Sequence, residues 1–336
     1  MSGPASGRAQ LEVSDLRVQI AGRHGVVHPV DGVSLEIAPG EATGLVGESG
    51  SGKSMTLRSI LGLLPPEATV TSGKVVFDDT DLTRLPRSRL NKVRGAKIAM
   101  IFQEPMSALN PVMRVGNQIA EGPLIHLGMS RAQAARRAIE LMQRVGIPDP
   151  ERRFRAFPHE FSGGMRQRVM IAMALSCDPE LILCDEPTTA LDVTIQDQIL
   201  RLLARLCRES GTSLMFVTHD LPVVAQVCHQ VAVMYAGRIV ERGTVSQVFS
   251  RPLHPYTLGL LRSAPDVDRP GQSLVPIGGS PPSLASPPAG CRFHPRCKFA
   301  EEDCKVSDPP LRLLDASRAT ACLHYERCLD EIGADT

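Results

Sequence analysis

The sequence predicts an α/β fold in which a mostly parallel sheet carries a helical insertion and is followed by a small cysteine-rich C-terminal module. Three observations support this prediction. Short apolar, β-branched runs alternate with stretches of helical period, as in α/β proteins. The segment 114–177 reads as one helix after another. The last five of the nine cysteines fall in the final fifth of the 336-residue chain.

Each expected strand is short, apolar and bounded by Gly, Pro or Asp, which is typical of buried parallel strands. The strands are Ala42–Val46, Ile98–Phe102, Leu181–Cys184, Ser213–Val217 and Val231–Tyr235. The insertion is expected to form helices over Val115–Leu127, Arg131–Val145 and Gly163–Ser176. After about Phe249, prolines recur and exclude long elements. We therefore place a domain boundary at residue 250.

Charge and hydropathy exclude several classes of protein. Lys and Arg number 37 against 36 Asp and Glu, so no global charge favours nucleic acid as a partner. Met1–Gln10 has no apolar core and does not read as a secretory signal. The longest apolar runs, such as Val223–Val227, fall short of the roughly 20 residues that cross a bilayer. Any membrane association is therefore expected to go through a partner.

One segment predicts a phosphate site. The residues Gly47-Glu48-Ser49-Gly50-Ser51-Gly52-Lys53-Ser54 fit the pattern G-x-x-x-x-G-K-[ST], between the strand Ala42–Val46 and a helix expected over Met55–Leu64. Glycines let backbone N–H groups turn inward on phosphates, Lys53 adds charge at the β and γ oxygens, and Ser54 offers a hydroxyl to Mg²⁺. These eight residues and Met55 are the expected nucleotide-binding residues.

A second segment predicts hydrolysis of the nucleotide. The apolar strand Leu181–Cys184 delivers Asp185 and Glu186 at its C-terminal end, where ligands bind in open α/β sheets. Asp185 can hold Mg²⁺, and Glu186 can polarise the attacking water. Strand-end acids are common by themselves, but together with the phosphate loop they favour hydrolysis over passive binding.

Phe161-Ser162-Gly163-Gly164-Met165-Arg166-Gln167-Arg168 stands between these two segments. With it the chain resembles the ATPase subunits of ABC transporters. The resemblance implies that Ser162, Gly163 and Gly164 open a helix whose N–H groups face the γ-phosphate bound by an opposite subunit. The active site would then be composite, and the chain would hydrolyse ATP only when paired with a second ATP-binding domain.

Other family elements follow in the expected order. By resemblance, Gln103 senses Mg²⁺ and water and contacts the transmembrane partner, and His219 contacts the γ-phosphate. In the segment Ala190-Leu191-Asp192, Asp192 is expected to cross the dimer interface. The chain departs from the family where an aromatic residue usually stacks on adenine. Here it offers Ile20, Val26 and Val27, so apolar contact is expected to replace stacking.

The resemblance covers about residues 11–330 and narrows to the dipeptide/oligopeptide (and nickel) importer branch. The segments that resemble this branch are Ile101-Phe102-Gln103-Glu104-Pro105-Met106-Ser107-Ala108-Leu109-Asn110-Pro111, His254-Pro255-Tyr256-Thr257 and the cysteine-rich tail. It implies a P-loop NTPase of the ABC type over 11–250, with a RecA-like core, the helical subdomain and an antiparallel β-subdomain near residues 11–40 and 70–80. Residues 251–330 would be the importer-type C-terminal extension.

The same resemblance implies a place and a set of partners. The chain would lie at the cytoplasmic face of the membrane with two permease subunits, an extracytoplasmic substrate-binding protein and a second ATPase, and would power peptide import. Two alternatives remain: an importer of nickel or another small solute, and a soluble ABC ATPase. The soluble class usually carries two ATPase halves or a long coiled coil, whereas this chain has one half and no sustained heptads.

The cysteines of the tail predict a staple for a segment too rich in proline to build a core. Cys291, Cys297, Cys304 and Cys322 are separated by 5, 6 and 17 residues. Disulfides conflict with a cytosolic location, and structural zinc usually shows a close C-x₂₋₄-C pair, which is missing. The spacing resembles that of importer tails that hold a [4Fe–4S] cluster, and structural zinc is the alternative. Cys328 is either spare or a substitute ligand, and His294 is not expected to be one.

Overall fold

The computed structural model describes residues 9–22, 25–189, 191–264 and 275–334. They form two compact units. The first comprises the described residues of Met1–Ile37, Ala42–Thr83 and Val217–Thr336, and the second comprises Ala38–Glu41 and Arg84–Phe216. Ala190, one residue of the predicted interface segment, lies outside the described residues.

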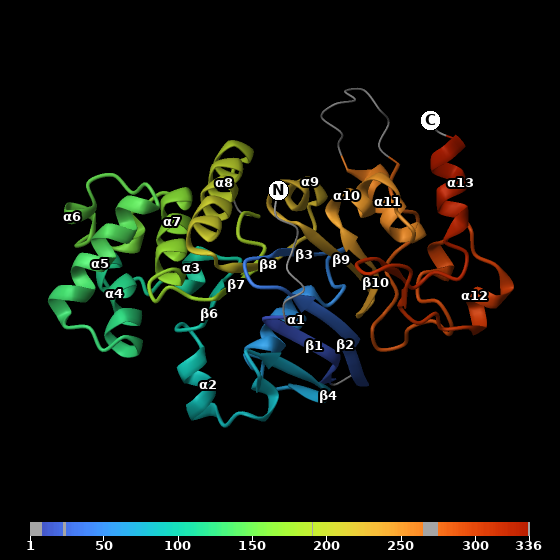
Figure 1. The fold of residues 1–336 in the computed structure, drawn as a ribbon, viewed down its shortest axis with the longest axis horizontal. Helices are drawn as coiled ribbons and strands as arrows, with labels where there is room; N and C mark the ends of the chain where they lie inside the picture. The colour runs from blue at the N-terminus through green and yellow to red at the C-terminus, as the bar shows by residue number, and fades with distance from the viewer. Residues whose placement is uncertain (1–8, 23–24, 190, 265–274, 335–336) are drawn as a thin grey trace. The chain divides into compact units, whose positions relative to one another are not determined.

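The first unit contains an antiparallel sheet with the strand order β2-β1-β4-β5, and its longer strands lie side by side in Figure 1. Along β1, Leu11, Val13, Leu16 and Val18 are at most 2% exposed, because one face of the sheet covers the core. This sheet confirms the predicted antiparallel subdomain. Its strands are β1 (Leu11–Gly22), β2 (Gly25–Ile37), β4 (Ala68–Phe77) and β5 (Thr80–Asp81).

A second set of strands in this unit has the order β11-β12-β10-β9-β3. β3 pairs in parallel with β9, and β9 pairs antiparallel with β10. The C-terminal extension adds β12 to the edge of β10, where Thr320 faces Glu241. All residues of β3 are buried, as its short run without charged residues predicts. The strands are β3 (Ala42–Val46), β9 (Gln230–Tyr235), β10 (Arg238–Thr244), β11 (Arg312–Leu313) and β12 (Ala319–Thr320).

The helices of the first unit are short. They are α1 (Lys53–Ile60), α9 (Leu221–Val227), α10 (Val245–Ser250), α11 (Pro255–Ser263), α12 (Glu302–Val306), α13 (Glu326–Ala334) and the 3₁₀ turn His294–Arg296. The predicted end of α1 at Leu64 is wrong. The helix ends at Ile60 because Gly62 turns left-handed (φ 59°), and the Leu63 N–H donates back to the Arg58 carbonyl.

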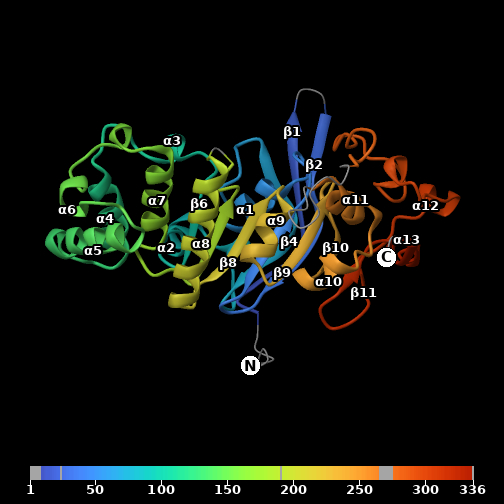
Figure 2. The same cartoon turned by 90° about the horizontal axis from the view of Figure 1, so that it is seen from above.

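The second unit contains three neighbouring strands in the order β8-β7-β6, and β6 pairs in parallel with β7. The strands are β8 (Ser213–Thr218), of which residues 213–216 belong to this unit, β7 (Leu181–Asp185) and β6 (Ile98–Ile101). The predicted helical insertion is confirmed, and in Figures 1 and 2 the helices α4 to α7 lie side by side. α5 begins at a capping box between Ser130 and Gln133. The helices are α2 (Arg87–Val93), α3 (Pro105–Ala108), α4 (Val115–His126), α5 (Arg131–Arg144), α6 (Pro150–Arg153), α7 (Gly163–Ala174) and α8 (Val193–Ser210).

Two further expectations concern the cysteines outside the tail and membrane-spanning helices. The four cysteines outside the tail, Cys177, Cys184, Cys207 and Cys228, are each at most 8% exposed, which confirms them as small buried side chains. Among the described residues, no helix combines the length and the apolar character that a membrane span requires.

Candidate nucleotide-binding site

The phosphate loop of the first unit runs from the end of β3 into α1. Gly47 and Gly52 have positive φ angles, 154° and 108°. A Cβ atom at Gly47 would lie 2.1 Å from the Met234 carbonyl oxygen, and one at Gly52 would lie 1.9 Å from the Pro29 carbonyl oxygen. Backbone contact thus excludes any side chain at both positions. The strand-loop-helix context predicted for the motif is therefore present.

The Lys53 ammonium is held over this loop. Lys53 is the first residue of α1 and is 4% exposed. Its Nζ donates to the carbonyl oxygens of Gly47 (2.7 Å) and Glu48 (3.0 Å). The Ser51 hydroxyl oxygen is buried and has no hydrogen-bond partner among the described residues. A buried cation at a helix N-terminus, with an unsatisfied hydroxyl beside it, is suited to binding an anion such as a phosphate group.

In the second unit, the two acids follow β7 as predicted. Asp185 is 2% exposed. Glu186 takes the left-handed region (φ 45°), which is strained for a residue with a side chain. Its Oε2 accepts hydrogen bonds from Thr189 Oγ1 (3.0 Å) and Gln103 Nε2 (3.4 Å). The fold thus brings Gln103 and Glu186 together, although they are 83 positions apart in the chain.

The signature segment opens α7. Ser162 is its N-cap and accepts a hydrogen bond from the Met165 N–H at 3.4 Å. Ser162 and Gly163 are exposed and Gly164 is half-buried. A Cβ atom at Gly164 would lie 2.7 Å from a methyl group of Ile195. The N-terminus of α7 is therefore open to an external anion, as the composite-site expectation requires.

Three other predicted positions lie on the surface. Asp192 is exposed and is the N-cap of α8. His219 is exposed and follows β8. Of the three apolar residues offered for adenine, Ile20 and Val27 face each other across the β1–β2 pair, and Val26 is 45% exposed. An apolar surface is thus present on this hairpin.

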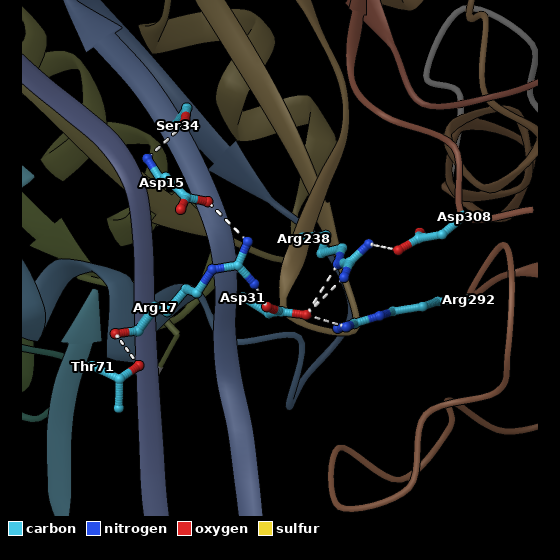
Figure 3. A network of polar contacts seen from close by, with 8 residues as sticks. All are labelled: Asp15, Arg17, Asp31, Ser34, Thr71, Arg238, Arg292 and Asp308. Carbon is cyan, nitrogen blue, oxygen red and sulfur yellow. Dashed lines mark hydrogen bonds and ion pairs between the residues drawn. The ribbon is translucent and has the colours of Figure 1, made fainter. Parts of the chain in front are cut away.

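Asp31, a residue that sequence reasoning missed, is the centre of a charged network in the first unit. Figure 3 shows the Asp31 carboxylate facing the guanidinium groups of Arg17, Arg238 and Arg292. Arg238 Nε and Nη2 donate to its Oδ2 at 3.1 and 2.9 Å, and Arg238 also pairs with Asp308. Burial raises the pKa of Asp31, but Arg238 and Arg292 outweigh it and leave the pKa below 3.8. The network ties the C-terminal extension to β2.

Glu241 is a second missed residue. Its carboxylate is fully buried on β10 and accepts the backbone N–H groups of Leu253 (2.8 Å) and His254 (2.9 Å), where α11 begins. Burial raises the pKa of Glu241 from 4.5 to about 7. Burial also lowers the pKa of His254 to about 3. A neutral His254 can then cap α11 by accepting the Tyr256 N–H on Nδ1 (3.1 Å). The local sequence, Arg238-Ile239-Val240-Glu241-Arg242, does not mark this carboxylate as buried.

The tail brings its thiols together. Cys291, Cys297, Cys304 and Cys322 line one small cavity, and Cys322 has its pKa raised to about 12 by burial and by the other three thiols. The Cys291 N–H donates to the Cys304 carbonyl at 2.9 Å. Cys328 is fully buried on α13 and outside the set that lines this cavity.

A more compact group of ligand atoms includes two residues that line this cavity, Cys304 and His324. Among the described residues, Asp303, Cys304 and His324 form the one group that offers three metal-ligand atoms, one from each residue, all within 4.8 Å of one another. His324 Nε2 lies 3.0 Å from both Asp303 carboxylate oxygens. His294 also lines the cavity, with Nδ1 2.9 Å from the Cys291 carbonyl oxygen. No three of the four cavity sulfurs are as close together as this group.

Comparison with known proteins identifies the family. A probable peptide ABC transporter ATP-binding protein of Sinorhizobium fredii is 52% identical over 314 residues, which are 93% of this chain and 94% of that protein. The chain belongs to the ATP-binding proteins of peptide ABC transporters. The ABC transporter family matches residues 30–189, and the family described as the oligopeptide/dipeptide transporter C-terminal region matches 240–304.

Other members are similarly related. The oligopeptide transport ATP-binding protein OppD of Salmonella typhimurium is 47% identical, covering 95% of each chain, and the dipeptide transport ATP-binding protein DppD of Bacillus subtilis is 52% identical, covering 85% of this chain and 86% of that protein. A solved ATP-binding cassette, described as dimeric, post-hydrolysis and bound to ADP and Pi, matches with a TM-score of 0.63 at 28% identity, over 70% of this chain and 98% of that chain. The predicted ABC-type ATPase fold is thereby confirmed.

Proposed function

We propose that this chain hydrolyses ATP to power the import of peptides across the cytoplasmic membrane, with the catalytic roles divided among the residues above. The observation that carries the proposal is the pair of hydrogen bonds that Thr189 and Gln103 make to Glu186 Oε2, directly after the buried Asp185. They orient one carboxylate at the end of a parallel strand, which is where a general base for water attack is needed.

In this mechanism the phosphate loop binds the nucleotide. Gly47 to Ser54 and Met55 surround the phosphates with backbone N–H groups, and Lys53 neutralises their charge. Mg²⁺, held by Ser54, Asp185 and Gln103, would supply charge neutralisation at the β and γ oxygens. Glu186 accepts a proton from the attacking water, and His219 donates to the γ-phosphate. Ile20, Val26 or Val27 supplies the apolar contact for adenine.

Hydrolysis requires a second subunit. The N-terminus of α7, where Ser162 and Gly163 are exposed and Gly164 is half-buried, carries the positive end of the helix dipole and would face the γ-phosphate of the opposite chain. Asp192 would lie at the same interface. A solved relative of the same fold is dimeric in its ADP-bound state, which supports this arrangement. The second ATPase is either identical to this chain or homologous to it.

The remaining partners follow from the family. Relatives are peptide transport ATP-binding proteins, so the proposal includes two permease subunits, an extracytoplasmic substrate-binding protein and a position on the cytoplasmic face of the membrane. The stretch around and beyond Gln103 supports a permease contact, because Phe102, Val112 and Ile125 are 39, 83 and 67% exposed. Exposed apolar side chains mark protein contacts where they form one continuous patch, so the proposal assigns these three to one permease contact.

We further propose that Cys291, Cys297, Cys304 and Cys322 hold a [4Fe–4S] cluster, with structural zinc as the alternative. They converge on one cavity, yet no three of their sulfurs lie within 4.8 Å of one another among the described residues. Tetrahedral zinc with bonds of about 2.3 Å would need sulfurs under about 4 Å apart. A four-iron cluster is larger than a single zinc ion and accommodates thiolates that lie farther apart, and its role would be to fold and hold the tail.

Turnover by the assembled transporter tests the function. Glu186→Gln keeps the shape of the side chain and removes the base, so ATP binding should persist while hydrolysis falls by about 10²- to 10⁴-fold. Lys53→Ala should weaken binding as well. Near-normal turnover by the Glu186→Gln variant would refute the assignment of the base.

A further inference from the structure

The phosphate loop is in contact with the C-terminal extension, far away in the chain. Arg296 Nη1 donates to Glu48 Oε2 at 2.7 Å, and Nη2 donates to Oε1 at 3.0 Å. The two residues are 248 positions apart. This pair is bidentate, which is the arrangement in which arginine and a carboxylate interact most strongly. The Arg296 side chain is only 4% exposed, and that of Glu48 is 27% exposed, so water screens the pair weakly.

The other bonds of Arg296 fix its guanidinium group. Nε donates to the Gly278 carbonyl (2.9 Å), Nη2 to the Ile277 carbonyl (3.4 Å) and Nη1 to the Tyr235 hydroxyl (3.4 Å). The group thus has little freedom to leave Glu48. Arg296 directly precedes Cys297, one of the cavity thiols, so the loop that carries these thiols also carries the contact to Glu48.

The backbone of Glu48 has a second partner in the extension. Its N–H donates to the Tyr256 hydroxyl at 2.7 Å. The Tyr256 ring is fully buried between Tyr235 and Phe293, with ring centroids 4.5 and 5.4 Å away. Both the side chain and the peptide of Glu48 are therefore held from outside the nucleotide-binding domain predicted over residues 11–250.

We propose that Arg296 and Tyr256 are positioning residues for the phosphate loop, through which the C-terminal extension sets the affinity for nucleotide; this rests on the function proposed above. Two physical effects act together. The Glu48 carboxylate lies on a loop that binds a polyanion, and Arg296 neutralises it. Tyr256 orients the Glu48 peptide, and through it the turn in which the Ser51 N–H donates to the Glu48 carbonyl (3.2 Å).

Equilibrium binding of Mg²⁺–ADP to the full-length chain tests the electrostatic part. Arg296→Ala should weaken binding by on the order of tenfold, the equivalent of about 1.4 kcal/mol. Adding Glu48→Gln to that variant should restore most of the affinity, because it removes the unpaired charge. Lys298→Ala is the matched control. It lies two residues away and pairs with Glu331, and it should bind like the wild type.

If the role of Arg296 were purely structural, adding Glu48→Gln would not restore the affinity that Arg296→Ala loses. If Arg296→Ala binds normally, or if Glu48→Gln fails to restore its affinity, the inference is wrong. Tyr256→Phe removes one oxygen atom and keeps the ring packing, so it tests the loop contact even if Arg296→Ala does not fold. It should weaken binding by roughly threefold, as the loss of one neutral hydrogen bond implies, and wild-type affinity would overturn the role of Tyr256.

Two measurements distinguish a failure of this inference from a failure of the proposed function. In the assembled transporter, Arg296→Ala should raise KM for ATP and leave kcat nearly unchanged, because Glu186 is untouched. A fall in kcat with unchanged KM would contradict a positioning role in binding. Lys53→Ala is measured in parallel. If it binds normally, the proposed nucleotide site is wrong; if it alone loses binding, only the role of the extension fails.

Discussion

Gly52→Ala perturbs the phosphate loop at its most crowded point. The added Cβ atom would lie 1.9 Å from the Pro29 carbonyl oxygen and 2.7 Å from the Met234 methyl group. Pro29 O belongs to the backbone of β2 and cannot turn aside, so the loop must move by about an ångström to reach ordinary contact. Such overpacking costs about 1–3 kcal/mol, and the left-handed conformation adds about 1–2 kcal/mol for any residue with a Cβ atom.

Gly50→Ala in the same loop is the matched control. Its φ is 79°, and a Cβ atom there would have no heavy atom within 4 Å, so only the conformational cost of about 1–2 kcal/mol applies. Urea unfolding of the full-length chain without nucleotide measures both variants. Gly52→Ala should lose about 1–3 kcal/mol more stability than Gly50→Ala. Equal losses would show that backbone contact with Pro29 does not constrain the loop.

Three further predictions concern other parts of the chain. The pKa of Glu241 is raised from 4.5 to about 7 in the folded state, so its contribution to stability is present below pH 4.5 and lost as pH rises through 7. The stability of the wild type relative to Glu241→Gln should therefore fall by about 3 kcal/mol between pH 4.5 and 7.5 in urea unfolding, and a constant difference would contradict the raised pKa. Cys297→Ser should remove iron and its absorbance near about 400 nm from anaerobically purified protein; zinc without iron in the wild type would favour a zinc site instead. The chain, when monomeric by light scattering, should hydrolyse ATP far more slowly than the assembled transporter, and equal rates would refute the composite site.

The local elements and the phosphate motif could be predicted from the sequence because their signals lie within a few residues. β3, a short run without charged residues, has the predicted bounds, Ala42–Val46. The helix α7 begins at the predicted Gly163, because Ser162 offers an N-cap side chain to the first turn. The end of α1 was predicted wrongly, since the apolar pattern continues past Gly62 although the backbone there turns left-handed.

The four tail thiols line one cavity, as their clustering in the sequence suggests, and their binding of a [4Fe–4S] cluster stays a prediction. The charged contacts of the same segment could not be predicted. Nothing in the local sequence marks Asp31 as the acceptor for three arginines, two of which lie 207 and 261 positions away. Charged residues so far apart in the chain produce no periodic pattern. In the sequence, a charged residue on the surface looks the same as one that is buried in an ion pair.

By itself, the sequence determined the nucleotide chemistry and the family, because glycine, lysine, serine and carboxylate residues must stand at short, fixed spacings to surround a phosphate. The tertiary structure decided that Arg296 reaches Glu48 and that Tyr256 receives its N–H. It also decided that Glu241 is a buried carboxylate with its pKa raised to about 7. These properties depend on which distant groups share a water-excluded space, and burial and pairing of that kind arise only when the chain has packed.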